Sequence, residues 1–267
     1  MAPKRLRADE ILVQRGLAES RSQARAIILA GQVRSGTRVI DKAGYPLDPD
    51  AELTVIDAPR FVSRGGEKLE HALQTFQFDV SELRCADFGA STGGFTDVLL
   101  QHGAAHVYAV DVGYGQLAYR VRMDERVTVL DRTNARYLEE LPEPVDLVTI
   151  DVSFISLALV LPAARRVLKP DGSVIALIKP QFEAGKERVG KGGVVRDPRV
   201  HRDVLRHVFD AAGDSGFRLL GLTASPITGP AGNVEFLALL TLREGNPIGT
   251  ARLVDEAMRS VPTKSSA

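Results

Sequence analysis

The feature that most constrains the fold of this 267-residue chain is an alternation of apolar strands and helical segments that begins near residue 64. Nearly continuous apolar runs, such as residues 145–150 and 173–178, are typical of strands that are buried on both faces. Helical patterns separate these runs, which favours parallel strands joined by crossover helices. We therefore predict an α/β domain with a doubly wound, parallel sheet.

The first 46 residues differ from the rest of the chain in charge. They hold nine Lys and Arg side chains against four Asp and Glu, a net charge of +5. Because the whole chain holds 34 of each kind, the remaining residues carry a net charge of −5. A basic segment of this size favours a phosphate-containing partner. The alternative is an ordinary solvated surface.

Two short helices are predicted in this basic segment. The first ends at Gly16, and Ser20 is a good N-cap for a second helix that stops at Gly31. Arg21 and Arg25 lie one turn apart on this second helix, away from its apolar side. The arrangement indicates a small domain with a charged helix face.

Strand-like pieces at residues 32–40 and 52–57 follow the two helices, so the small domain is of the α+β class. The last 22 residues read as a short helix with a disordered end. The predicted division of the chain is a small basic domain, a linker, the α/β domain and a C-terminal extension: residues 1–58, 59–63, 64–245 and 246–267.

A glycine-rich loop follows the first strand of the α/β domain. Gly89, Gly93 and Gly94 permit a tight turn and a close approach of the backbone to a ligand. Ser91 stands where a dinucleotide-binding fingerprint requires its second glycine, which disfavours a nicotinamide-dependent oxidoreductase. The loop residues predicted to bind a cofactor are Asp87, Gly89, Ser91, Thr92, Gly93, Gly94 and Phe95.

Acidic residues end three successive strands, namely Asp87, Asp111 and Asp131. A carboxylate at Asp87 would repel a pyrophosphate but not the ammonium and sulfonium of S-adenosyl-L-methionine. Asp111 is predicted to accept the ribose hydroxyls of this cofactor, and Asp131 to face its adenine. Any one of these acids could instead be a helix N-cap, but the three together with the loop favour the cofactor.

Charged residues also end the fourth and fifth strands. Asp151 and Lys179 are expected to meet at the carboxyl edge of the sheet, next to the cofactor. The alternative interpretations are that Asp151 is only a helix N-cap and that Lys179 is only a solvated lysine at the sheet edge. Glu235 interrupts an apolar strand, which indicates a sheet end or an active site. Lys68, from its local sequence alone, is an ordinary helix-surface lysine.

Four of these residues together resemble the Lys-Asp-Lys-Glu tetrad of ribose 2′-O-methyltransferases of the FtsJ type: Lys68, Asp151, Lys179 and Glu235. The strings SRGGEKL, DFGASTGGFTDVLL, DVSFISL and IKPQFE are similar to the TlyA family of rRNA methyltransferases, whose members are often labelled haemolysins. The similarity spans nearly the whole chain, and Ser91-Thr92 is its main departure from the FtsJ pattern. It implies a Rossmann-like class I methyltransferase domain with a mostly parallel sheet of seven strands. This domain would methylate the cytidine 2′-hydroxyl in 16S or 23S rRNA, or in both.

The resemblance also implies a role for each member of the tetrad. Lys179 would act on the proton of the 2′-hydroxyl or stabilise its developing charge. Asp151 would orient Lys179, while Lys68 and Glu235 would position the nucleotide. No metal ion is required by this chemistry.

The segment of residues 5–57 resembles an RNA-binding module shared by a ribosomal small-subunit protein, pseudouridine synthases and tyrosyl-tRNA synthetases. The module implies binding of structured RNA, here ribosomal RNA or a ribosomal subunit, through phosphate contacts. A loop at residues 185–192 lacks the Ser or Thr of a phosphate-binding P-loop, but its cations could reach RNA. The residues predicted to contact RNA are Arg5, Arg7, Arg21, Arg25, Arg64, Lys186 and Arg188.

Two other function classes stay open from the residues alone. A membrane-lytic protein would need a spanning segment, a secretion signal or a cationic amphipathic helix, and the sequence shows none of these. An RNA-binding assembly factor without turnover is disfavoured only by the intact tetrad. The single cysteine, Cys85, excludes an internal disulfide and predicts a cytoplasmic protein.

Overall fold

The computed structural model describes residues 5–56, 59–245 and 249–261, and it divides the chain into two compact units. The small unit ends at Arg60, and the large unit begins at Phe61. The side chain of Phe61 is buried in the large unit, where it packs against α3 (Gly65–Phe76) at Gly66. The predicted linker of residues 59–63 is therefore divided between the two units.

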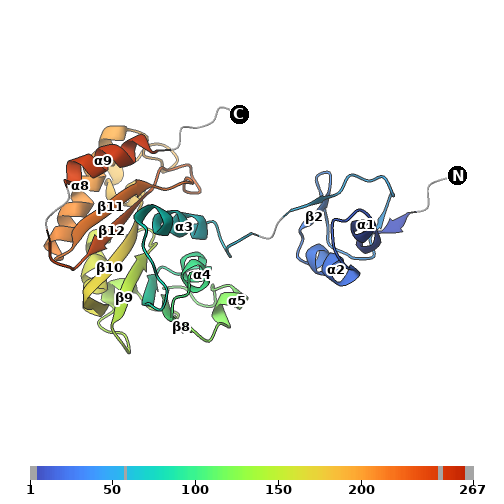
Figure 1. Cartoon of the computed structure of the whole chain (residues 1–267). Helices are drawn as coiled ribbons and strands as arrows, with labels where there is room; N and C mark the ends of the chain where they lie inside the picture. Colours follow the sequence, from blue (N-terminus) through green and yellow to red (C-terminus); the bar gives the residue numbers. More distant parts are fainter. Residues whose placement is uncertain (1–4, 57–58, 246–248, 262–267) are drawn as a thin grey trace. The chain divides into compact units, whose positions relative to one another are not determined.

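The large unit is built on one seven-stranded sheet (Figure 1). Its strand order is β11-β12-β10-β9-β6-β7-β8. Strand β12 runs in the opposite direction to the other six strands. This confirms the predicted Rossmann-like sheet. The strands are β6 (Arg84–Phe88), β7 (His106–Val110), β8 (Val127–Leu130), β9 (Val145–Ile150), β10 (Leu168–Ile178), β11 (Arg218–Ala224) and β12 (Phe236–Thr241).

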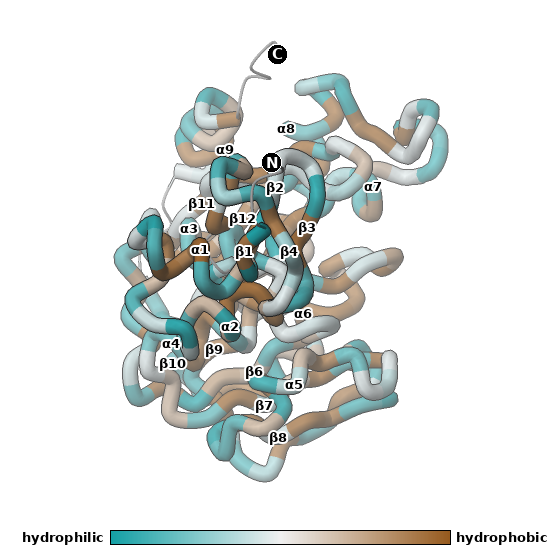
Figure 2. The backbone as a smooth tube through the Cα atoms, turned by 90° about the vertical axis from the view of Figure 1, so that its right-hand side faces the viewer, coloured by the Kyte–Doolittle hydropathy of each residue, from teal (hydrophilic) through white to brown (hydrophobic). Residues whose placement is uncertain are grey.

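Helices cover both faces of this sheet because its strands bury apolar side chains on both sides. Brown, hydrophobic stretches of the trace lie along β7 and β8 (Figure 2). In β6, Phe88 packs into one core and Cys85 into the other, and complete burial of a side chain as large as Phe88 contributes about 1.5–3 kcal/mol. One face of the sheet is covered mainly by α3, α4 (Gly94–Gln101) and α5 (Tyr119–Arg122). The other face is covered mainly by α6 (Leu161–Val167), α8 (Pro198–Asp214) and α9 (Thr250–Arg259).

The C-terminal helix α9 belongs to the large unit. Its residues Val254 and Ala257 are buried in the same core as α8, and Figure 1 shows the two helices beside β11. The short helix predicted in the C-terminal extension is thus present and completes one face of the sheet. The disordered end predicted after it falls on residues 262–267, outside the described residues.

The small unit has the predicted α+β composition. Helix α1 (Ala8–Gln14) is followed by α2 (Arg21–Leu29), and the Ser20 side chain caps α2 by accepting a hydrogen bond from the Gln23 N–H at 3.2 Å. Both helices pack on a core that includes Ile11 and Ile28. The short strands are β1 (Leu6–Arg7), β2 (Val33–Ser35), β3 (Arg38–Ile40), β4 (Pro46–Leu47) and β5 (Thr54–Val55).

A buried carboxylate joins the two helices of the small unit. The side chain of Asp9 is fully buried, and it pairs with Arg7 at 2.9 Å and with Arg21 and Arg25 at 3.3 Å each. These three arginines hold the pKa of Asp9 far below its usual range, with the Arg7 hydrogen bond as the largest cause. Their side chains remain about half exposed, so their outer N–H groups still face solvent.

We expect Asp9→Asn to loosen the small unit, because three guanidinium groups would then converge without a buried counter-charge. A depressed pKa adds stability above the ordinary value of 3.8, and this stability is lost as the pH falls through the lower folded pKa. Hydrogen–deuterium exchange at pH 7 should therefore show faster exchange over residues 8–29 in the variant. Asp41→Asn removes the same charge from an exposed position and should leave exchange unchanged. Equal exchange in both variants would contradict the role of Asp9.

Candidate active site

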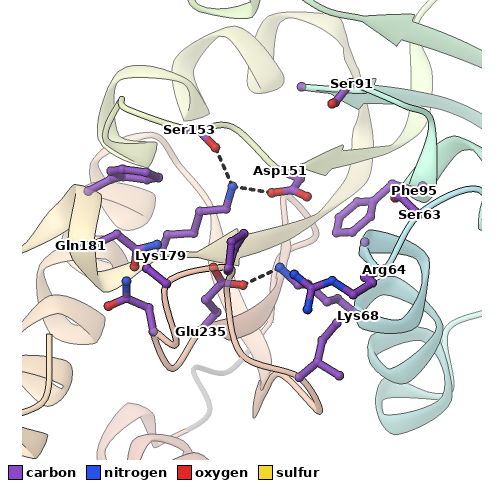
Figure 3. Close-up of a pocket in the computed structure, with 18 of the residues that line it drawn as sticks. Ser63, Arg64, Lys68, Ser91, Phe95, Asp151, Ser153, Lys179, Gln181 and Glu235 are labelled. Atoms are coloured by element: carbon purple, nitrogen blue, oxygen red, sulfur yellow. Dashed lines mark hydrogen bonds and ion pairs between the residues drawn. The ribbon is translucent and has the colours of Figure 1, made fainter. Parts of the chain in front are cut away.

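Two charged residues meet where β9 and β10 end. Asp151 directly follows β9, and Lys179 directly follows β10. The Lys179 Nζ lies 2.7 Å from Asp151 Oδ1 and donates a hydrogen bond of 2.9 Å to the Ser153 hydroxyl (Figure 3). The charge pair expected from the strand ends is present, with Ser153 as an additional partner.

A second ion pair lies beside the first and is more deeply buried. Lys68 lies on α3, and Glu235 is the residue immediately before β12. The Lys68 Nζ lies 2.5 Å from Glu235 Oε2 (Figure 3). Lys68 is 7% exposed and Glu235 is 2% exposed, so each charge depends on the other for compensation. Lys68 is therefore not the ordinary surface lysine that its local sequence indicates.

The two pairs line one cavity of about 610 Å³, called the larger cavity here. A smaller cavity of about 470 Å³ adjoins it at the carboxyl ends of β6, β7 and β9. Both cavities share five lining residues: Gly89, Ser91, Asp151, Ser153 and Phe154. The shared residues mean that a ligand in one cavity would lie next to a ligand in the other.

The glycine-rich loop passes between β6 and the larger cavity. Gly89 has a φ of +85°, and a Cβ at this position would lie 2.6 Å from the backbone oxygen of Asp151. Gly93, with a φ of +92°, is the N-cap of α4, and Leu117 and Val121 fill the space beside it. Of the predicted loop residues, the cavity linings include Gly89, Ser91, Thr92, Gly94 and Phe95.

Asp111 reaches the smaller cavity from the end of β7. Its two carboxylate oxygens accept hydrogen bonds from the N–H groups of Ser91 at 2.8 Å and Gly113 at 2.7 Å. Each oxygen keeps a further lone pair for a ligand. The position and the free acceptors are those expected for a residue that holds a ribose.

Asp87 lies beneath the loop and outside the linings of both cavities. Its fully buried carboxylate accepts hydrogen bonds from the N–H and hydroxyl of Thr96, at 3.0 and 2.7 Å, and from the Thr149 hydroxyl at 3.0 Å. Burial raises the pKa of Asp87 to about 7 against these hydrogen bonds. Asp87 therefore ties α4 to β9, and its predicted contact with a cofactor stays a prediction.

Asp131 also lies outside both cavity linings. Its carboxylate accepts a hydrogen bond from the Gly115 N–H and pairs with Arg122, each at 3.2 Å. The smaller cavity is lined instead by the segment that follows, residues 133–136, which includes Asn134. The adenine contact predicted for Asp131 stays a prediction, and the residues that border the smaller cavity are the ones that follow Asp131.

An exposed aromatic residue that the sequence pattern does not predict lies at the junction of the two cavities. Phe154 is 90% exposed with a φ of +64°, and its ring lies 4.9 Å from that of Phe182. An exposed aromatic residue in a left-handed conformation is uncommon, but nothing in the string DVSFISL marks it in advance.

The three cations predicted to contact RNA from the large unit are not gathered at one place. Arg64 is exposed and lines the larger cavity. Lys186 and Arg188 lie in the exposed turn η3 (Lys186–Arg188), outside the cavity linings, where Arg188 pairs with Asp203 at 2.7 Å. Arg64 is therefore the one of the three that faces the candidate site.

Within residues 5–56, 59–245 and 249–261, no helix is long and apolar enough to cross a membrane. The same described part of the chain holds no group of three or more His, Cys, Asp and Glu side chains suited to a metal ion.

Comparisons with known proteins give one consistent result. The FtsJ-like methyltransferase family matches residues 61–242, and the S4 domain matches residues 6–53. The 16S/23S rRNA (cytidine-2′-O)-methyltransferase TlyA of Mycobacterium tuberculosis is 48% identical to this chain, over 97% of this chain and 98% of its own length. Hemolysin A of Brachyspira hyodysenteriae is 42% identical, over 87% of this chain and 98% of its own length. A solved structure named as a hemolysin from Streptococcus thermophilus has a TM-score of 0.72 at 43% identity, and covers 97% of this chain and 98% of its own.

Gly89→Ala should weaken binding of S-adenosyl-L-methionine at least about tenfold, because the positive φ and the nearby Asp151 oxygen together force the loop to move. Gly103→Ala is the matched control: Gly103 has the same φ of +85°, but its Cβ would meet only ordinary contacts, from 3.4 Å outward. Isothermal titration of both variants measures the difference. Equal affinities would show that the close approach at Gly89 does not shape the loop.

Proposed function

Because this chain belongs to the FtsJ-like methyltransferase family and, with its S4 domain, to the TlyA group, we propose that it methylates the 2′-hydroxyl of cytidine in 16S or 23S rRNA, or in both. The observation that carries the proposal is the Lys179–Asp151 pair at the junction of two adjacent cavities. One cavity suits an adenosyl cofactor and the other a nucleotide.

The residues of the smaller cavity fit S-adenosyl-L-methionine. Asp111 would accept the ribose hydroxyls, with its carboxylate already fixed by two backbone N–H groups. The segment of residues 133–136 would border the adenine, and the loop at Gly89 and Ser91 would border the methionine part. When bound, the cofactor supplies an electrophilic methyl group.

Lys179 is the residue best placed to act on the acceptor hydroxyl. The Lys179 ammonium donates one N–H to the Ser153 hydroxyl, pairs as a charge with Asp151, and lies 5.9 Å from the centre of the Phe182 ring. Its third N–H would donate to the 2′-oxygen and stabilise the negative charge that develops there as the proton leaves. If Lys179 is neutral instead, it accepts the hydroxyl proton directly; otherwise the proton leaves to solvent.

The buried Lys68–Glu235 pair serves a different purpose in the proposal. The pair is neutral as a whole and lines the larger cavity, so it offers polar contacts to a nucleotide without attracting a separate counter-ion. Holding the ribose in line with the methyl group supplies much of the acceleration of a reaction between two bound substrates.

The small unit supplies RNA affinity in this proposal. Its outward-facing arginines, together with exposed Arg5, suit the phosphates of structured RNA. An rRNA substrate implies a cytoplasmic location. We favour methyl transfer over membrane lysis or non-catalytic assembly because a relative at 48% identity is named as a methyltransferase.

Lys179→Ala should lower methyl transfer at least about 100-fold, since it removes the group that stabilises the 2′-oxygen. Affinity for S-adenosyl-L-methionine should stay within about threefold. The assay incubates unmodified small and large ribosomal subunits separately with labelled cofactor and maps the modified nucleotide. Lys169→Ala, at the other end of β10, removes a lysine from another ion pair and should stay active. No incorporation by the unaltered protein into either subunit would refute the proposed function.

The double variant Arg5→Gln, Arg25→Gln should bind rRNA more weakly than the unaltered protein. Each lost phosphate contact should reduce the slope of log affinity against log salt concentration by ~0.9. Arg252→Gln removes a charge from an 82% exposed side chain on α9 and should not change the slope. Filter binding over a series of salt concentrations measures all three. A similar change in the α9 variant would mean that net charge, and not this surface, drives binding.

A further inference from the structure

A carboxylate outside the tetrad connects the two segments that carry Asp151 and Lys179. Glu183 ends α7 (Pro180–Glu183), the short helix that directly follows Lys179. Its Oε2 accepts a hydrogen bond from the Ser156 hydroxyl at 2.7 Å, and its Oε1 accepts one from the Leu157 N–H at 2.9 Å. Each carboxylate oxygen thus accepts a hydrogen bond from the segment that follows Asp151, and Glu183 lies outside the linings of both cavities.

These contacts close a ring around the reacting group. From Lys179 the chain runs through α7 to Glu183, which bonds to Ser156. Three residues back along that segment is Ser153, whose hydroxyl accepts the hydrogen bond from Lys179 Nζ at 2.9 Å. The loop of residues 152–156 is short, so the position of its end at Ser156 limits where Ser153 can lie.

We propose that Glu183 is a positioning residue for methyl transfer: it holds the loop of residues 152–156 against α7 so that Ser153 and Asp151 aim the third N–H of Lys179 at the acceptor oxygen. The inference rests on the proposed function of Lys179. It adds two residues to the tetrad. Ser153 is in direct contact with Lys179, and Glu183 acts through the loop that carries Ser153.

The positioning role of Glu183 depends on its hydrogen bonds and not on its charge. Burial is the largest influence on Glu183 and raises its pKa above the ordinary value, against the opposing effects of the Leu157 and Ser156 hydrogen bonds and of the His207 charge. The Leu157 N–H can donate to the carbonyl oxygen of a neutral side chain, and the Ser156 hydroxyl can either donate or accept.

The test compares Glu183→Ala, Ser153→Ala and the double variant in the subunit methylation assay. Each single variant should lower kcat about tenfold, and the double variant no more than the worse single, because both changes break the same ring. Affinity for S-adenosyl-L-methionine should stay within about threefold in all three. A double variant whose loss is the product of the two single losses would overturn the proposal, as would a cofactor affinity that falls in step with kcat.

Two further variants separate positioning from general stability. Glu183→Gln keeps an oxygen that can accept from the Leu157 N–H, so it should restore kcat to within about threefold of the unaltered protein, even if Glu183→Ala fails to fold. Glu187→Ala removes a neighbouring exposed acid and should have full activity. A Gln variant that is folded but still tenfold slower would overturn the proposal. Failure of the proposed function is distinct from all of these results, because the unaltered protein would then be inactive too.

Discussion

The hydrogen-bonded edge where β6, β9 and β10 end side by side is the constraint on which the site depends. The Asp151 N–H donates to the Phe88 carbonyl at 2.9 Å, so Asp151 lies where the neighbouring strand gives way to the glycine-rich loop. Gly89 lies so close to the Asp151 carbonyl that no side chain fits between them. One set of backbone contacts therefore fixes both the wall of the smaller cavity and the acid that orients Lys179. A change that separates these strand ends would disturb cofactor and acceptor together.

The two ion pairs of the site differ in the way their charges are used. Lys68 and Glu235 have side chains only 9% and 1% exposed, whereas those of Lys179 and Asp151 are 11% and 23% exposed. The first pair is closed on itself and gives shape and polarity to the cavity. In the second, the Lys179 ammonium also donates to the Ser153 hydroxyl, and Lys179 lines the larger cavity. In the proposed reaction, a lysine held in this way would still have an interaction to make in the transition state.

The sequence predicts the sheet and the placement of the tetrad well, because apolar periodicity locates strand ends and parallel strands bring those ends together. It does not show which way a side chain turns. Asp87 ends a strand as predicted, but its partner Thr149 lies 62 residues away and pulls the carboxylate beneath the loop. Asp131 pairs with Arg122, which precedes it by only 9 residues, and the strand pattern does not predict this pairing either. Lys68 is the opposite case: only the fold brings Glu235, 167 residues away, to a lysine that looks ordinary on its helix.

The two units differ only modestly in net charge: residues 1–60 carry +2 and residues 61–267 carry −2. The slight acidic excess of the large unit suits a cationic cofactor and gives no attraction for a polyanionic substrate. In the small unit, Asp9 uses part of the positive charge of three arginines to fix their positions, so its net charge overstates the attraction it offers. What the unit gains is order: guanidinium groups held in place lose less freedom when they meet phosphates. The +5 of residues 1–46 is thus largely offset within the small unit by the acidic residues 48–57, and what this unit offers to RNA is the fixed placement of its arginines.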